Sequence, residues 1–304
     1  MFTRIQGLRE KMTVLSRLLE FWDAVPSYIK FATGATVLAS TITIVVLRAK
    51  AKSSHQRPKV QYPRDTVILH NPGRGPFAPS LVPFSVKVET YLRILKIPHQ
   101  TVTDYQKGPK DKWPWIEYND EVVADSAFII KFINKTFNVD LDKGFNEEEL
   151  ATAHALRKMM EENTYWTFVM NRWYFDKNNT IHKILHVPSK SIAAMKKRIK
   201  ENTYQFGIGR HTEEEVNQIM AEDLEALSKF LGNKKFLLGD AVCQADCAIF
   251  GQLSQFYWQC LNTPAETTVK SFPNLCKYCE RMKDLYWPDW EECNTNGGTK
   301  ESTA

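Results

Sequence analysis

Residues 113–133, WPWIEYNDEVVADSAFIIKFI, indicate the fold of the first half of the chain. A proline precedes two short apolar runs, WIEY and EVVA, and Asn119-Asp120 between them is typical of a tight hairpin turn. Asp125 and Ser126 then open a helix. A stripe of apolar residues recurs along it at helical spacing, namely Phe128, Ile129, Phe132 and Ile133. The segment therefore predicts a β-hairpin followed by a helix that is buried along one side.

A strand, a helix and a second strand are predicted before this hairpin. Residues 66–70, TVILH, form a short apolar run, and a loop rich in proline and glycine separates them from a helix at residues 84–95. Ile97-Pro98 ends that helix, and residues 99–105, HQTVTDY, alternate as a strand. The three elements form one right-handed βαβ unit, so we expect a small α/β domain.

Residues 141–293 are predicted to form a second, all-helical domain. At least five segments in this region have helical apolar spacing, and one of them begins with a capping box made of Thr212 and Glu215. The polar tail, residues 294–304, is predicted to be disordered. All six cysteines lie in the last quarter of the chain, at spacings unlike those of a disulfide-stapled secreted domain. This pattern favours reduced thiols in the cytosol.

The N-terminal region contains a candidate membrane anchor. Residues 31–47, FATGATVLASTITIVVL, carry no charge and approach the ~20 residues that a helix needs to cross a bilayer. The alternatives are a buried helix and a cleaved signal peptide, because Ala49-Lys50-Ala51 resembles a small-x-small cleavage site. Residues 1–30 favour the anchor, since they have the spacing of an amphipathic helix instead of the short basic start of a signal peptide.

The distribution of positive charge sets the expected orientation of this anchor. Residues 48–64 contain six Lys and Arg residues and no acid, whereas Arg17 and Lys30 are the basic residues in the fifteen positions before the apolar run. Positive charge is enriched on the cytoplasmic side, so we predict a single-pass membrane protein with a basic linker and a cytoplasmic C-terminal body. No basic stripe with interleaved aromatic residues follows, which excludes nucleic acid as a partner despite the net charge of +5.

Three segments resemble the glutathione S-transferase superfamily: SLVPFSVKVETYLRI at residues 80–94, the segment quoted first, and LLGDAVCQADCAIFGQL at residues 237–253. PSLVPFSVKVETYLR, WPWIEYN, GIGRHTEEE and YCERMKDLYWPDW are also similar to the failed-axon-connections family, which includes nematode cadmium-responsive proteins and is related to metaxins. The resemblance covers residues 65–293. It implies a thioredoxin-like α/β domain at residues 65–140, followed by an all-α domain like the C-terminal domain of a transferase, behind the N-terminal transmembrane helix.

The resemblance also implies a glutathione site. Transferases place a cis-proline before the third strand, where the backbone of the preceding residue pairs with the cysteinyl part of glutathione; the matching residues are Trp113 and Pro114. Asp125 and Ser126 match the residues that hold the γ-glutamyl carboxylate, at a helix N-terminus suited to an anion. The alternatives are that Pro114 is an ordinary turn residue and that Asp125 and Ser126 only cap the helix.

The thiol-activating position departs from the family pattern. The closest relatives are expected to have Ser or Cys followed by Pro-Phe-Cys, and this chain has Val82, Pro83, Phe84 and Ser85. Valine cannot donate a hydrogen bond to a thiol, and without cysteines a dithiol redox reaction at this position is excluded. Ser85 is the remaining catalytic candidate, with helix capping as its alternative role, and Ser80 is the other nearby hydroxyl.

These features lead to two functional hypotheses. The first is a glutathione-binding or adaptor protein with little or no catalysis, acting with protein partners in axonal development or in a metal or xenobiotic stress response. The second is an active glutathione transferase that conjugates glutathione to electrophiles. A homodimer is compatible with both. Cys276-x-x-Cys279 lacks a second such pair to complete four zinc ligands, so we predict buried, unreactive thiols and no metal site.

Overall fold

The computed structural model describes residue 26, residues 60–177 and residues 189–295. The chain divides into two units, Met1–Gln61 and Tyr62–Ala304, and the fold below belongs to the second. The predicted anchor at residues 31–47 lies outside the described residues, as do most of the segments predicted on either side of it. Among the described residues, no helix combines the length and the apolar character that crossing a membrane requires.

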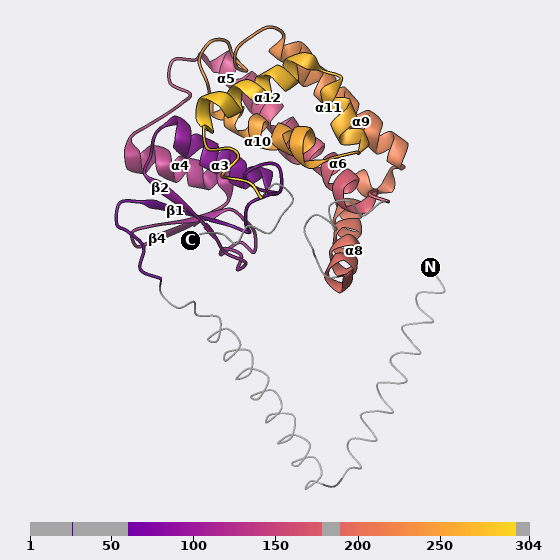
Figure 1. The fold of residues 1–304 in the computed structure, drawn as a ribbon, viewed down its shortest axis with the longest axis horizontal. Helices are drawn as coiled ribbons and strands as arrows, with labels where there is room; N and C mark the ends of the chain where they lie inside the picture. The colour runs from indigo at the N-terminus through magenta and orange to yellow at the C-terminus, as the bar shows by residue number, and fades with distance from the viewer. Residues whose placement is uncertain (1–25, 27–59, 178–188, 296–304) are drawn as a thin grey trace. The chain divides into compact units, whose positions relative to one another are not determined.

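A four-stranded sheet forms the centre of the first half (Figure 1). Its strands are β1 (Val67–Asn71), β2 (His99–Thr103), β3 (Trp115–Tyr118) and β4 (Glu121–Ala124), in the order β2-β1-β3-β4. β1 and β2 are parallel, whereas β3 is antiparallel to both β1 and β4. The predicted βαβ unit and the predicted hairpin are both confirmed.

Two helices supply the apolar core beneath this sheet. α3 (Pro83–Ile94) connects β1 to β2, and α4 (Ser126–Phe137) follows the hairpin. One buried cluster joins alternate strand residues to these helices, and its members include Val67, Leu69, Val88, Tyr91, Ile116, Ile129 and Ile133. Successive side chains of a strand point to opposite faces, so the alternate residues of β1 reach the same core. This arrangement is the predicted thioredoxin-like domain.

The second half is helical. Its elements are α5 (Glu147–Lys158), η1 (Met159–Thr164), α6 (Tyr165–Val169), η2 (Met170–Tyr174), α8 (Ser189–Phe206), η3 (Ile208–Arg210), α9 (Glu213–Leu231), α10 (Gln244–Gln259), α11 (Pro264–Lys270) and α12 (Pro273–Tyr286). Two of these, η1 and η2, are π-helical turns that continue α5 and α6. The capping box predicted at Thr212 and Glu215 is present at the start of α9.

Helix α10 is the central element of the helical half, and most of its residues are buried. It packs so closely on α3 that a Cβ atom added at Gly251 would lie 2.5 Å from the carbonyl oxygen of Pro83. At its start, the buried Asp246 carboxylate accepts hydrogen bonds from the backbone N–H groups of Leu237 and Cys243, at 2.8 and 2.9 Å. Asp246 therefore bonds back to the start of its own helix.

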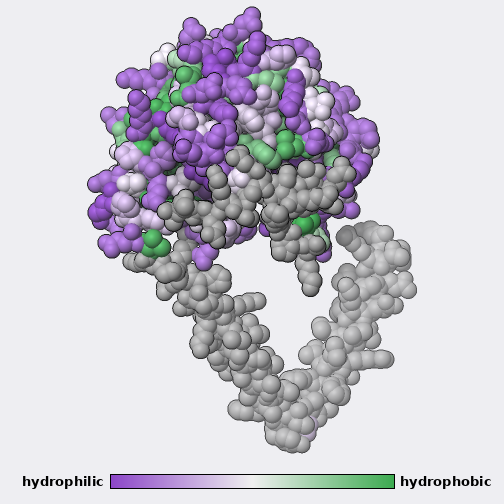
Figure 2. All heavy atoms as spheres, viewed as in Figure 1, coloured by the Kyte–Doolittle hydropathy of each residue, from purple (hydrophilic) through white to green (hydrophobic). Residues whose placement is uncertain are grey.

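On the face drawn in Figure 2, hydrophilic residues cover most of the described surface, and hydrophobic residues form small separate patches. All six cysteines are unpaired thiols, and Cys276 alone among them is partly exposed. In the described ranges, no group of three or more His, Cys, Asp or Glu side chains is placed to hold a metal ion.

Candidate functional site

The Trp113–Pro114 peptide bond is cis, as predicted. Pro114 is buried directly before β3, and the indole N–H of the half-buried Trp113 donates a hydrogen bond of 2.8 Å to the carbonyl oxygen of Asp104. This contact fixes the Trp113 ring against the segment that follows β2. The backbone of Trp113 therefore lies just before β3, whose first residue, Trp115, pairs with Ala124 at the end of β4, directly before α4.

The N-terminus of α4 is capped by Asp125. The Oδ1 atom of Asp125 accepts hydrogen bonds from the N–H groups of Ala127 and Phe128, at 2.9 and 3.4 Å. Asp125 has a φ of 82°, and its carboxylate is exposed to solvent. The predicted cap is confirmed. The exposed carboxylate offers this helix N-terminus one group for a cation, and the N–H of Ser126, which does not donate to the Asp125 carboxylate, is left for an anion.

Ser126 lies directly behind this cap and receives a hydrogen bond from a buried lysine. The Nζ atom of Lys87, on α3, donates to the Oγ atom of Ser126 at 3.2 Å. The same Nζ atom donates to Glu161 in η1 at 2.5 Å, and Arg157 contacts the other oxygen of Glu161 at 2.8 Å. Lys87 is 1% exposed. This network connects α4 to the helical half through one buried ammonium group.

Burial lowers the pKa of Lys87, because desolvation penalises the ammonium form, while the Glu161 carboxylate opposes that shift. An ion pair this deep depends on both partners, since removing either one leaves an uncompensated buried charge. The Ser126 hydroxyl accepts from the ammonium group with one lone pair, and its own proton remains available for an acceptor. Lys87 therefore orients Ser126 as a hydrogen-bond donor.

Lys87 and Glu161 were missed by the sequence analysis. Lys87 lies in SVKVETYL, where a lysine between two valines reads as the solvent-facing position of an amphipathic helix. α3 is instead buried on nearly all sides, because the sheet covers one side and α10 covers another. The feature of the sequence that could have indicated this burial is the lack of any clearly polar stripe along α3. The partner at position 161 lies 74 residues away and could not be assigned from local pattern.

The N-terminus of α3 offers no exposed hydroxyl. Val82 is its N-cap residue and makes no side-chain capping bond. The Ser80 hydroxyl donates to Asn71 Oδ1 at 2.7 Å and accepts from the backbone N–H of Val82 at 3.0 Å, and Ser80 is 1% exposed. Ser85 is fully buried, and its Oγ atom has no hydrogen-bond partner. Neither serine reaches the surface at this helix end.

A tyrosine from the helical half approaches this helix end. The rings of Tyr165, on α6, and Phe84 lie 5.3 Å apart. Burial raises the pKa of Tyr165, although the positive charges of Arg172 and Arg198 oppose the shift. Its hydroxyl is therefore protonated at neutral pH and can donate a hydrogen bond. The sequence analysis did not single out this residue, because the contact joins positions 84 and 165 across the two halves.

The loop before α3, residues 72–82, is held by side chains of the helical half. Gln255 donates to the carbonyl oxygen of Ser80 at 3.0 Å, and Arg172 donates to that of Leu81 at 3.1 Å. Arg172 is itself buried and bound to the side-chain oxygen of Gln255 at 2.9 Å. These bonds satisfy buried carbonyl groups, so the loop is fixed in position by α10 and η2.

A second ionic network lies at the other end of α3. The buried Glu89 accepts from Arg74 at 2.8 Å and from Arg93 at 3.2 Å. Arg93 also contacts Asp289 at 2.5 Å and lies over the Trp287 ring, 3.9 Å from its centroid. Charged groups along α3 therefore join the thioredoxin-like half to the helical half at two separate places.

Comparison with known proteins agrees with this architecture. Residues 83–179 match the family model described as the glutathione S-transferase N-terminal domain, and residues 220–282 match the glutathione S-transferase C-terminal domain. The isoprene-epoxide glutathione S-transferase of Rhodococcus sp. (strain AD45) is 30% identical over 73% of this chain and 98% of its own length. The chain belongs to the glutathione S-transferase family.

Similarity also extends to the relatives expected from the sequence. The failed axon connections protein of Drosophila melanogaster is 30% identical over 78% of this chain, which spans 62% of that protein's length. Human metaxin-2 is 24% identical over 67% of this chain and 82% of its own length. The predicted resemblance to failed axon connections and to metaxins is confirmed.

Solved structures show the same fold. The beta-etherase LigF from Sphingobium sp. strain SYK-6 superposes with a TM-score of 0.53 at 15% identity, covering 75% of this chain and 98% of its own. A glutathione transferase family member from Pseudomonas fluorescens, crystallised with two glutathione molecules, superposes with a TM-score of 0.52 at 14% identity, covering 74% of this chain and 91% of its own. At these identities the likeness concerns the fold.

Proposed function

We propose that this chain is a membrane-anchored, glutathione-transferase-like protein that binds glutathione with little or no transferase activity. The observation that carries the proposal is the contrast between the capped N-terminus of α4, where Lys87 supports Ser126, and the N-terminus of α3, where Val82 replaces an activating residue. An adaptor role in axonal development, or a role in metal or xenobiotic stress, is consistent with similarity to the failed axon connections protein.

The residues at the start of α4 fit the γ-glutamyl end of glutathione, which carries an ammonium and a carboxylate group. The exposed Asp125 carboxylate would hold the ammonium group. The Ser126 N–H and the Ser126 hydroxyl would hold the carboxylate, with the Lys87 charge behind them, because the N–H groups of Ala127 and Phe128 already donate to Asp125. Trp113 would offer its backbone to the cysteinyl part. When bound, glutathione would supply a thiol that becomes a nucleophile only as its thiolate.

The sulfur end of such a ligand would meet no activating group in this conformation. Val82 has no polar atom in its side chain, the Ser80 hydroxyl is committed to Asn71, and the Ser85 hydroxyl is inaccessible. Free thiols have a pKa near ~8.5, so an unactivated thiol is mostly protonated at neutral pH. Slow conjugation or none is the expected consequence.

An active transferase is the second candidate, because the Rhodococcus relative that matches over most of its length is named as an enzyme. In that case the Tyr165 hydroxyl is the candidate donor, because the Tyr165 ring contacts Phe84 at the start of α3. Turnover of a generic electrophile by the full chain, compared with the spontaneous reaction, separates the two candidates.

Binding to glutathione tests the proposal. The full chain, purified in a non-ionic detergent, should be retained on immobilised glutathione and eluted by free glutathione. Asp125→Ala combined with Ser126→Ala should abolish retention. Thr212→Ala is the matched control. It removes the N-cap of α9, in the helical half, and not that of α4, so it should leave retention unchanged. If the wild-type chain is not retained at all, the glutathione proposal fails.

The membrane anchor is a separate part of the proposal and has its own test. Alkaline carbonate should leave the full chain in the membrane pellet, and deletion of residues 31–47 should release it. Protease added to the cytoplasmic side of intact membranes should digest the C-terminal body, because the proposal places that body in the cytoplasm. Release of the full chain by carbonate would exclude residues 31–47 as a spanning helix.

A further inference from the structure

His70 is a buried titratable residue outside the groups assigned so far to glutathione. It lies in β1 and is 2% exposed. The alternate residues Val67 and Leu69 belong to the core shared with α3 and α4, so the His70 side chain points to the opposite face of the sheet. The groups that surround the imidazole on that face decide whether it carries a proton.

Two carboxylates flank the His70 ring, one at each nitrogen. The Nδ1 atom lies 3.2 Å from Oδ2 of Asp104, directly after β2, and the Nε2 atom lies 2.9 Å from Oε1 of Glu117, in β3. Tyr62, before β1, presents its ring edge-on to the imidazole, with the ring centroids 5.9 Å apart. These three residues are the charged and titratable groups that the described elements place against His70.

The arrangement favours the protonated form of His70. A neutral imidazole has one N–H group and can donate to one of the two carboxylates, whereas an imidazolium has one N–H group for each. Carboxylates at this distance favour the charged form. Trp115 adds to the effect, because its ring is stacked on the imidazole at a centroid distance of 3.4 Å, and the face of an indole attracts a positive charge.

Asp104 connects His70 to Trp113. Its carbonyl oxygen accepts the hydrogen bond from the Trp113 indole at 2.8 Å. Its backbone N–H donates to the carbonyl oxygen of Asn71 at 2.8 Å, and its Oδ1 atom accepts from the N–H of Gln106 at 2.8 Å. The remaining carboxylate oxygen, Oδ2, contacts His70. His70 is therefore one of the groups that set where the carbonyl group of Asp104 lies.

A second contact of His70 reaches the residue after Pro114. Trp115, whose ring is stacked on the imidazole, is also the residue opposite His70 in the antiparallel register of β1 and β3. The loop between β2 and β3 packs closely on the same side chain, since a Cβ atom added at Gly108 would lie 2.6 Å from it. His70 thus contacts Trp115 directly and Trp113 through Asp104.

We propose that protonated His70 is a positioning residue for the Trp113 backbone and that the affinity for glutathione falls when His70 loses its proton. The inference rests on the proposed function, in which Trp113 offers its backbone to the cysteinyl part of glutathione. A neutral ring leaves one carboxylate facing a nitrogen lone pair, so Asp104 and its carbonyl group are held less firmly. Affinity is therefore full below the pH at which His70 titrates in the folded chain and is lost as pH rises through it.

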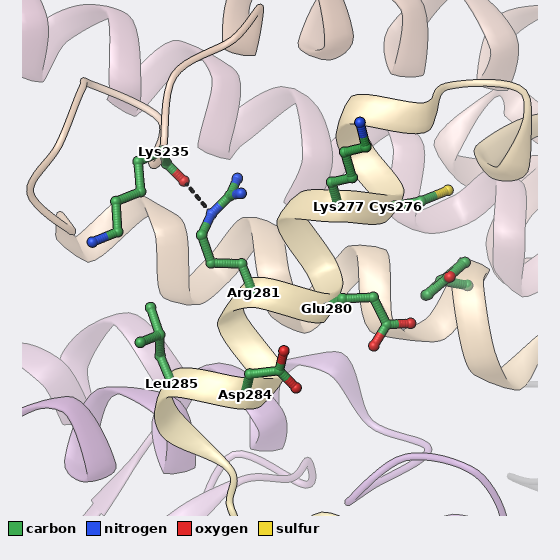
Figure 3. A pocket seen from close by; sticks show the side chains of 8 residues that line it. Lys235, Cys276, Lys277, Glu280, Arg281, Asp284 and Leu285 are labelled. Atoms are coloured by element: carbon green, nitrogen blue, oxygen red, sulfur yellow. Dashed lines mark hydrogen bonds between the residues drawn. The ribbon is translucent and has the colours of Figure 1, made fainter.

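This dependence on pH distinguishes His70 from other side chains that hold backbone groups in place. Arg281, in the hollow beside α12, donates from Nε to the carbonyl oxygen of Lys235 at 2.9 Å, shown by the dashed line in Figure 3. Arg172 holds the carbonyl oxygen of Leu81 in a similar way. A guanidinium group stays protonated, so these contacts do not change with pH. Histidine is the side chain that ordinarily titrates between about pH 5 and 8.

The indole N–H signal of Trp113 tests the connection without glutathione. In a ¹⁵N spectrum of the full chain in a non-ionic detergent, Trp113→Phe identifies this signal by its loss. The signal should shift between about pH 6 and 9 in the wild type. It should not shift in His70→Asn, because the Asn amide can donate to Asp104 at every pH. His99→Asn is the matched control: it removes another histidine of the sheet, which contacts the carbonyl oxygen of Ile97, and should keep the shift.

Calorimetry of glutathione binding over the same pH range tests the consequence for the ligand. The thiol and amino groups of glutathione titrate in this range too, so each variant is compared with the wild type at each pH. Between about pH 6 and 9, the affinity of the wild type should fall at least threefold more than that of His70→Asn. His99→Asn should follow the wild type.

The outcomes separate this proposal from the proposed function. A Trp113 signal that does not shift with pH in the wild type, or that shifts equally in His70→Asn, would overturn the proposal whether or not glutathione binds. A normal shift with equal pH profiles of affinity in the wild type and His70→Asn would make His70 a structural contact and overturn its positioning role. Failure to bind glutathione at any pH would overturn the proposed function, and the positioning role with it, even where the Trp113 signal shifts.

Discussion

The N-termini of α3 and α4 lie in the same thioredoxin-like half, yet they offer very different groups to a ligand. The start of α4 has an exposed carboxylate at Asp125 and a hydroxyl at Ser126 that a buried lysine orients. The start of α3 has Val82, whose side chain makes no capping bond, and two serines that do not reach the surface. Transferases use both helix ends, one to hold glutathione and one to activate its sulfur.

In the proposed site, binding and activation therefore depend on separate residues. Nothing in the capping of α4 requires a hydroxyl at position 82, because Asp125 and Ser126 receive their contacts from α3 and α4 themselves. A chain can therefore lose the activating group and keep the geometry that holds the γ-glutamyl end. The following predictions test one helix end against the other, from the largest expected effect to the smallest.

Removing the carboxylate behind α4 should have the largest effect. Glu161→Gln leaves the buried Lys87 and its neighbour Arg157 without a compensating charge. We expect the free energy of unfolding to fall by about 3–5 kcal/mol, measured by urea denaturation of the full chain. Glu162→Gln is the control, because it breaks the exposed pair with Lys158 and should cost at most ~1 kcal/mol. Equal effects of the two substitutions would contradict the proposed importance of the buried network.

Restoring a hydroxyl at α3 should produce the next largest effect. Val82→Ser places a hydrogen-bond donor at the N-cap of α3, where the helix dipole also favours a thiolate. Turnover of a generic electrophile should rise at least tenfold, while the dissociation constant for glutathione stays within a factor of about two. Val82→Ala controls for the change in size and should leave turnover low. An unchanged rate in Val82→Ser would show that this position does not limit catalysis.

Substitutions at Asp125 separate its two roles. Asn caps a helix as well as Asp does and tolerates positive φ, so Asp125→Asn should leave stability almost unchanged. Asp125→Ala removes the cap and should cost about 1 kcal/mol or more. Both variants lack the charge for the γ-glutamyl ammonium group, so both should bind glutathione about tenfold more weakly in calorimetry. Normal binding by Asp125→Asn would reduce Asp125 to a helix cap.

Lowering the pH should have a smaller effect on stability, through the ion pair that Arg93, near the C-terminal end of α3, forms with Asp289. The hydrogen bond from Arg93 lowers the pKa of Asp289 to about 2, below its ordinary value of 3.8. Because the folded state holds the carboxylate more strongly, its stabilisation is fully present above about pH 4 and is lost as pH falls towards 2. Asp289→Asn should flatten the stability curve in that window. An unchanged curve would show that this partly buried pair contributes nothing measurable.

The sequence predicted those parts of the molecule that depend on local pattern. The hairpin at Asn119-Asp120 and the cap at Asp125 follow from residues that are neighbours in the chain, whereas the cis bond before Pro114 was predicted from the resemblance to transferases. The Lys87–Glu161 pair could not be predicted in this way. A lysine in a short helix reads as exposed, and its burial becomes clear only when the helical half packs on α3.

The state of the two serines was also beyond local prediction. Ser85 follows Val82 at the third position of α3, where a capping or catalytic hydroxyl is plausible from spacing alone. Ser85 is instead fully buried, and the Ser80 hydroxyl is engaged by Asn71 in β1. The approach of Tyr165 to Phe84 likewise depends on how α6 packs against the thioredoxin-like half. Tertiary packing therefore decides which hydroxyl groups remain available.

The pKa of the thiol of glutathione bound to the full chain tests the central claim most directly. The thiolate absorbs in the near ultraviolet, so a pH titration of the difference spectrum at saturating protein measures this pKa. We predict saturable binding with a thiol pKa close to the ~8.5 of a free cysteine, because the α4 end holds the ligand and the α3 end does not activate it. A thiol pKa lowered by one unit or more would contradict the account, as would the absence of binding.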